Sequence, residues 1–118
     1  IFYINYAHAR INQLFKKANL TFEEASQIKA EQLSHESKDL IYEALLLPSV
    51  LNEAFTKRDM QKITDYLYSL ASSVHKFYNE HKIVGSQNEK EYLKVLAMVK
   101  LSIHIGLKLL GIQAKDVM

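Results

Sequence analysis

The stretch YAHAR at 6–10 places a tyrosine, a histidine and an arginine beside two alanines. Residues four positions apart share one face of a helix, so Tyr6 and Arg10 can act together. Alanines let another surface come close, and an aromatic ring and a guanidinium can hold a partner. The same stretch therefore fits either a helix packed in the protein's own core or a helix that meets a partner.

A second stretch, SSVHKFYNEHK at 72–82, interleaves flat rings with lysines. Rings that stack on bases and cations that bind phosphates are what single-stranded RNA loops require. The alternative is that the tyrosines belong to a core and keep their hydroxyl groups at its rim. Composition alone leaves both interpretations open.

The sequence carries no recognisable catalytic pattern. Its five histidines include no pair at the four-residue spacing of a helical metal site, and it has no cysteine. It also lacks a glycine-rich phosphate loop and a nucleophile elbow. HIGL at 104–107 differs by one residue from an ATP-contacting signature, but it lies inside an apolar helical pattern. We therefore predict no catalytic residue and no metal site, and we interpret Gly106 as a packing residue and His104 as lying at a helix flank.

The elements that must position these residues are helical throughout. Apolar residues recur at steps of three and four from 4 to 15, and the same pattern is strongest over 59–80 and 90–110. We expect the stripes of the two long helices to be buried against each other. Their members are Ile63, Leu67, Leu70, Val74 and Phe77, and Leu93, Leu96, Val99 or Lys100, Ile103, Leu107 and Leu110.

Several residues predict where helices begin and end. Thr21 opens a Thr-x-x-Glu capping box, and Ser34 or Ser37 can cap the next helix. Pro48 suits the first turn of a helix, because its missing N–H would have no partner there. Gly111 suits a left-handed helix end. Together these signals predict an all-α fold, an antiparallel bundle of about five helices.

Composition limits what the chain can be. With 118 residues and 48% hydrophobic residues, residues 1–118 are expected to form one helical domain. The absence of cysteine excludes disulfides and points to a reducing compartment, so we expect a cytoplasmic location. No apolar run approaches the roughly 20 residues that span a bilayer. Because the chain starts at Ile1 without methionine, we expect a fragment of a longer protein.

Charge is divided unevenly along the chain. Both ends are basic, whereas the segment 21–56 is acidic. A basic face built from the two ends could bind a polyanion, although ordinary surface variation explains the asymmetry equally well. We expect Arg10 and Lys82 to lie on one face and four acidic residues to lie away from it. These four are Glu23, Glu24, Glu31 and Glu36.

Three blocks in order resemble the C-terminal, DALR-type anticodon-binding domain of arginyl-tRNA synthetases. They are INYAHAR at 4–10, YLYSLASSVHKFYN at 66–79 and GLKLLGIQAKDVM at 106–118. The blocks cover nearly the whole chain. The sequence departs from the family where Tyr92-Leu93 replaces an Arg-Leu pair, and where DMQKIT lacks the family's proline and arginine.

The resemblance implies an all-helical domain that holds the anticodon stem-loop of arginine tRNA. The catalytic domain, which uses ATP with magnesium, would precede Ile1, so this fragment would bind RNA without cofactors and without catalysis. We expect a monomer with no membrane partner. By matched position, the implied RNA-binding residues are Tyr6, Arg10, Tyr78, Asn79, Lys82 in the loop 81–88, and Met118.

The roles of the remaining matched residues differ. We expect Ala7, His8 and Ala9 to pack, and the role of His75 stays open between packing and RNA binding. The alternative function is a helical protein-interaction or oligomerisation module that has lost RNA binding. A salt-dependent complex with arginine tRNA would favour the first function, and dimerisation without such a complex would favour the second.

Overall fold

A computed structural model describes residues 1–30 and 32–112, which form six helices and no strand. The predicted all-α bundle is confirmed, with six helices in the described part of the chain where about five were expected, and the short α2 starts at the predicted Thr21 capping box. The helices are α1 (Phe2–Lys17), α2 (Phe22–Ser26), α3 (His35–Ala44), α4 (Leu47–Lys57), α5 (Gln61–Glu80) and α6 (Glu89–Leu109).

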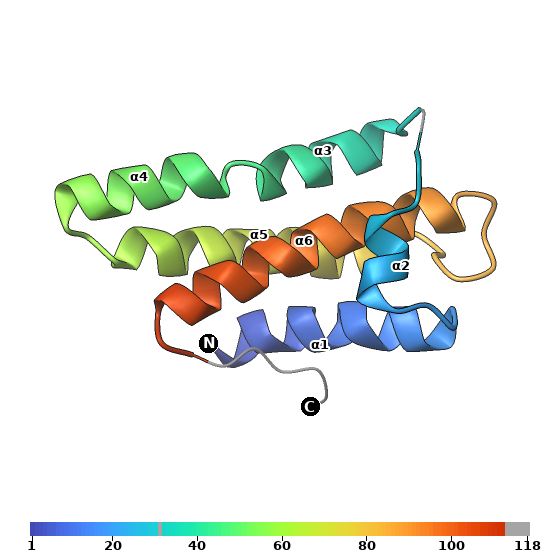
Figure 1. Ribbon diagram of the computed structural model, residues 1–118, viewed down its shortest axis with the longest axis horizontal. Helices are drawn as coiled ribbons and strands as arrows, with labels where there is room; N and C mark the ends of the chain where they lie inside the picture. The colour runs from blue at the N-terminus through green and yellow to red at the C-terminus, as the bar shows by residue number, and fades with distance from the viewer. Residues whose placement is uncertain (31, 113–118) are drawn as a thin grey trace.

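Helix α5 lies at the centre of the arrangement (Figure 1). It packs against α1 on one side and against α3 and α4, which follow each other along the chain, on the other. Helix α6 crosses the bundle and contacts α1, α2, α3 and α5. Helices α1 and α5, which are far apart in the sequence, are therefore packed against each other and against α6.

The core is built from the apolar stripes that the sequence predicts. All five stripe residues of α5 are buried, and so are Leu93, Leu96, Ile103 and Leu107 of α6. Val99 is fully buried, so it takes the inward position that the sequence left open between Val99 and Lys100. Leu110 is only partly buried, because it caps the end of α6.

Helices α5 and α6 approach each other closely at Gly106. A Cβ atom built on Gly106 would lie 2.7 Å from Cδ2 of Leu67, closer than such atoms pack. The predicted packing role of Gly106 is therefore confirmed. The tetrapeptide HIGL lies in the last turns of α6, with no strand before it among the described residues.

The predicted helix boundaries are confirmed. Thr21 and Glu24 form the reciprocal capping box, with a Glu24 N–H to Thr21 Oγ1 distance of 3.1 Å between heavy atoms. Ser34 is the N-cap of α3, and Pro48 lies in the first turn of α4. Gly111 follows α6 with a φ of 78°, the left-handed conformation that glycine adopts without strain.

Candidate nucleic-acid interface

Helices α1 and α5 bring Tyr6, Arg10 and Tyr78 together. The guanidinium carbon of Arg10 lies 3.8 Å from the centroid of the Tyr78 ring and 5.1 Å from that of Tyr6. Both tyrosines are partly exposed, at 41% for Tyr6 and 37% for Tyr78. The site thus presents a cation between two accessible rings, and we call these three residues the arginine cluster.

His75 supports the arginine cluster from within. It lies one helical turn before Tyr78, and its Nδ1 is 3.1 Å from Nη1 of Arg10, which donates the hydrogen bond. Its other nitrogen, Nε2, lies 3.5 Å from the carbonyl oxygen of Tyr3. Burial lowers the pKa of His75, and the Arg10 cation lowers it further against the opposing effect of the Tyr3 carbonyl. The ring is therefore neutral at neutral pH.

Further rings continue from the arginine cluster along the junction of α1 and α5. The Tyr6 ring meets the His75 ring edge-on at 5.2 Å, and Tyr3 lies 4.7 Å from His75. Tyr68 continues the row at 4.8 Å from Tyr3 and is 57% exposed. A chain of ring contacts thus holds the two helices in register beside Arg10.

Five of the tyrosines form two groups, one packed against the core and one exposed. Tyr66 is partly buried against the core and Tyr92 is buried in it, and both hydroxyl groups donate hydrogen bonds, that of Tyr66 to the Glu43 carbonyl at 2.7 Å and that of Tyr92 to Glu36 at 3.1 Å. Tyr6 of α1 and Tyr68 and Tyr78 of α5 are exposed where these two helices meet. The rings of the second group are accessible beside Arg10, as the RNA-binding interpretation requires, whereas Tyr42 is exposed on α3.

The small residues of the first stretch pack as predicted. Ala7 and Ala9 are buried, and His8 is buried at 2% exposure with its ring 6.2 Å from that of His104. Their burial presses α1 into the core and turns Tyr6 and Arg10 toward α5. The opening stretch therefore combines a packing face with a face that meets α5.

The other predicted site residues lie near the end of α5 or beyond the described part of the chain. Asn79 is exposed next to Tyr78, and Lys82 is exposed in the connection that follows α5. Met118 lies outside the described residues. An RNA contact by any of the three stays a prediction.

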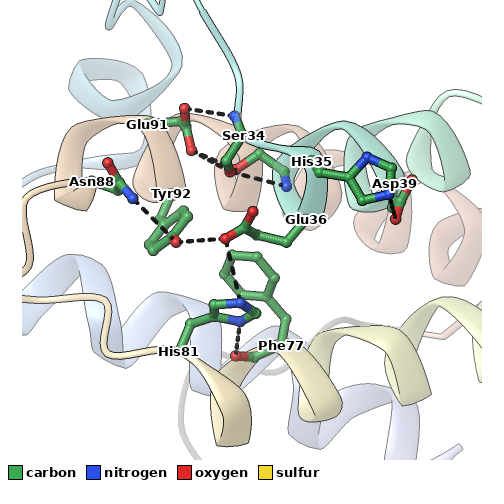
Figure 2. Close-up of polar contacts among 10 residues, drawn as sticks. Ser34, His35, Glu36, Asp39, Phe77, His81, Asn88, Glu91 and Tyr92 are labelled. Carbon is green, nitrogen blue, oxygen red and sulfur yellow. Dashed lines mark hydrogen bonds and ion pairs between the residues drawn. The ribbon is translucent and has the colours of Figure 1, made fainter.

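Polar contacts anchor the connection between α5 and α6 to α3 (Figure 2). His81 Nε2 lies 3.5 Å from Glu36 Oε2, and the Tyr92 hydroxyl donates to the same oxygen at 3.1 Å. Asn88 in turn donates to the Tyr92 hydroxyl. A backbone hydrogen bond lowers the pKa of Glu36, and the hydroxyl groups of Ser34 and Tyr92 lower it further, so Glu36 stays anionic at neutral pH.

The departure at Tyr92-Leu93 has a structural counterpart in these contacts. The Tyr92 ring meets Phe77 edge-on at 5.0 Å, and its hydroxyl links α6 to α3 through Glu36. One position earlier, Glu91 accepts hydrogen bonds from the backbone and side chain of Ser34, the residue that caps α3 (Figure 2). The start of α6 therefore holds the start of α3.

The expected separation of charges is wrong for Glu36. We expected it to lie away from the bases, but its carboxylate contacts His81 beside Lys82. The reason is that α3 packs against both α5 and α6 where the connection between them emerges. A cleft between α3 and α5 is lined by three acidic residues of α3, Glu36, Asp39 and Glu43, and by Glu80 and Lys76 of α5, so the acidic groups of α3 face α5 while the arginine cluster faces α1.

Among residues 1–30 and 32–112, no group of three or more His, Asp or Glu side chains could hold a metal ion. Within the same part of the chain, no helix is both long enough and apolar enough to cross a membrane.

Comparison with known sequences identifies relatives over the full length of the chain. The arginine–tRNA ligase of Aliarcobacter butzleri is 64% identical over 118 residues, and that of Campylobacter curvus is 52% identical over 116. The matches cover 100% and 98% of this chain. The chain spans 22% of the length of each of these relatives.

Solved structures agree with the sequence relatives. A Campylobacter jejuni protein assigned as an arginyl-tRNA synthetase superposes with a TM-score of 0.93 and 49% identity, over 99% of this chain and 26% of its own. Thermus thermophilus arginyl-tRNA synthetase superposes with a TM-score of 0.80 and 26% identity, over 98% of this chain and 21% of its own. Residues 4–118 match the family model for the DALR anticodon binding domain. The resemblance inferred from the three sequence blocks is thus confirmed, and this chain belongs to the family of DALR anticodon binding domains of arginyl-tRNA synthetases.

Proposed function

We propose that this chain holds the anticodon stem-loop of arginine tRNA on the exposed α1 and α5 surface around the arginine cluster. A catalytic domain in the same polypeptide would attach arginine to that tRNA with ATP and magnesium. The support is the family match together with relatives that are arginine–tRNA ligases. In this proposal the parent enzyme works in the cytoplasm as a monomer, and the present chain contributes binding and no chemistry.

The observation that carries the proposal is the position of Arg10 between Tyr6 and Tyr78. Unstacked anticodon bases need flat surfaces, and the phosphates between them need cations. Because Arg10 covers one face of the Tyr78 ring, a base would stack on the opposite face. Asn79 follows directly with an amide suited to a base edge, and Lys82 and Met118 would extend the contact along the loop.

A binding titration tests this function. The chain is titrated with arginine tRNA and with a tRNA that differs in its anticodon, each at several salt concentrations. We expect tighter binding of arginine tRNA and weaker binding of both as salt rises, because phosphate contacts release counterions. Equal affinity for the two tRNAs would contradict anticodon recognition. Dimerisation without tRNA binding would favour the interaction module instead.

A further inference from the structure

We propose that His75 is a positioning residue that holds the Arg10 guanidinium in the orientation in which it meets RNA, an inference that rests on the proposed function of the arginine cluster. His75 is 9% exposed, so it acts through Arg10 and has little surface of its own to offer a ligand.

Two different contacts are needed to orient a guanidinium. The Tyr78 ring, whose centroid lies 3.8 Å from the Arg10 guanidinium carbon, holds the head group over its face but does not fix the direction in which the N–H groups point. The hydrogen bond from Nη1 to His75 Nδ1 at 3.1 Å fixes this direction. Arginine carries five N–H donors, so one bond to His75 leaves donors that can address phosphate oxygens in a defined direction.

The same geometry assigns the tautomer of His75. Nδ1 accepts from Arg10 and therefore carries no proton, so the proton lies on Nε2, which faces the Tyr3 carbonyl. A protonated ring would turn an N–H toward the Arg10 N–H and place two cations side by side. The neutral ring with its proton on Nε2 is thus the form that can orient Arg10.

Three substitutions of His75 separate a role as hydrogen-bond acceptor from a role in packing. In His75→Asn the side-chain oxygen stands as many bonds from Cα as Nδ1 does, so it can accept from Arg10. In His75→Gln the oxygen stands where Nε2 does, so it cannot replace that bond. His75→Phe keeps a ring beside Tyr3 and Tyr6 and removes both nitrogens.

The experiment is a double-mutant cycle on the binding of arginine tRNA, with thermal melting to show that each variant is folded. We expect His75→Phe and His75→Gln to weaken binding roughly 2- to 10-fold, the usual range for one hydrogen bond, and His75→Asn to restore most of the affinity. In the Arg10→Ala background the three substitutions should change binding no further, because the residue through which His75 acts is gone.

Nitrogen NMR of His75 in the free chain gives a readout that needs no RNA and no variant. We expect an unprotonated Nδ1 and a protonated Nε2, and the opposite tautomer would overturn the proposal. It would also be overturned if Arg10→Ala weakened binding while a folded His75→Phe bound like the parent, or if His75→Phe had the same effect in both backgrounds. If Arg10→Ala itself bound arginine tRNA like the parent, the proposed function would fail instead.

Discussion

At the scale of single residues, the arginine cluster depends on the two faces of the Tyr78 ring. Tyr78 lies under the Arg10 guanidinium at 3.8 Å and is still 37% exposed. Its ring can therefore serve Arg10 on one face and a base on the other. In the proposed function, removal of Tyr78 would take away both the base-stacking surface and the ring that supports Arg10.

We expect Tyr78→Ala to weaken the binding of arginine tRNA roughly 5- to 150-fold, since stacking of one base on one aromatic ring contributes about 1–3 kcal/mol. Fluorescence titration of labelled tRNA measures the change. Tyr42→Ala is the matched control, because Tyr42 is a tyrosine on α3 that is 72% exposed. An unfolded Tyr78→Ala would show that Tyr78 is a core residue, and a folded variant with unchanged affinity would remove Tyr78 from the site.

His75 also predicts how stability depends on pH. Its pKa is lowered in the folded chain, so the unfolded chain binds a proton first as pH falls. The contribution of His75 is complete above its unfolded pKa of about 6.5 and is lost as pH falls toward the lowered folded value. The charged group that faces it is Arg10, with the uncharged hydroxyl-bearing rings of Tyr3 and Tyr6 beside it.

Urea unfolding at about pH 7.5 and about pH 5.5 measures this effect. We expect the free energy of unfolding to drop more between these values in the parent than in His75→Phe. All other titrating groups are the same in the two chains, so the difference belongs to His75. Equal drops would contradict the assignment.

At the scale of elements, the contact between α5 and α6 decides where the arginine cluster sits. Gly106 lets α6 approach α5 at Leu67, and both residues are buried. Since α1 packs against both α5 and α6, the spacing between those two helices also sets the position of α1. A change at Gly106 would therefore act on the site from a distance.

We expect Gly106→Ala to destabilise the fold by up to about 2 kcal/mol. The helix propensity of alanine favours the substitution by about 1 kcal/mol, but overpacking a filled core costs about 1–3 kcal/mol. We expect the cost of the clash with Leu67 to exceed the gain in helix propensity, because the leucine is fully buried and cannot move into solvent. Chemical denaturation measures the change in the free energy of unfolding.

Leu67→Ala provides the control for this prediction. Alone it should cost about 2–5 kcal/mol, because it leaves a cavity in the core. In that background Gly106→Ala should become neutral or stabilising, since its methyl group then enters vacated space. A cost that persists without the Leu67 side chain would mean that something other than this clash is responsible.

At the scale of the whole molecule, the two sides of α5 differ in charge. The cleft on the α3 side is lined by four carboxylates, those of Glu36, Asp39, Glu43 and Glu80, and by the single lysine Lys76, whereas the α1 side carries Arg10 among exposed rings. In the proposed function, we expect the excess of carboxylates to disfavour an RNA phosphate on the α3 side and Arg10 to attract one on the α1 side. The distribution therefore supports one orientation of a tRNA on this chain.

The logarithm of the binding constant for arginine tRNA falls linearly with the logarithm of the salt concentration. We expect Arg10→Ala to make this slope less steep by about 0.7, the value for one phosphate contact in single-stranded nucleic acid. Lys38→Ala is the matched control, because Lys38 is an exposed cation on α3. Its removal should leave the slope close to that of the parent. The same loss of slope in both variants would indicate diffuse attraction to the whole molecule with no oriented site.

The sequence by itself determined the elements and their buried faces. The stripes of α5 and α6, the capping box at Thr21, the cap at Ser34 and the left-handed Gly111 depend on residues within a few positions of each other, so local spacing was sufficient to predict them. The three motif blocks likewise carried the family, because each is a short contiguous stretch. The shared helix face of Tyr6 and Arg10 could also be predicted, because residues four positions apart lie on one side of a helix.

Only the tertiary structure decided how those elements meet. The partners Arg10 and His75 are 65 positions apart, and the bond between them depends on how α1 lies against α5. The same holds for Glu36, which contacts His81 because α3 packs against α5. Local spacing tells which face of a helix is apolar, but contacts between polar residues on different helices depend on crossing angles and offsets. These are set by how the whole core packs, at places such as Gly106 and Leu67, and no single stretch of sequence contains that information.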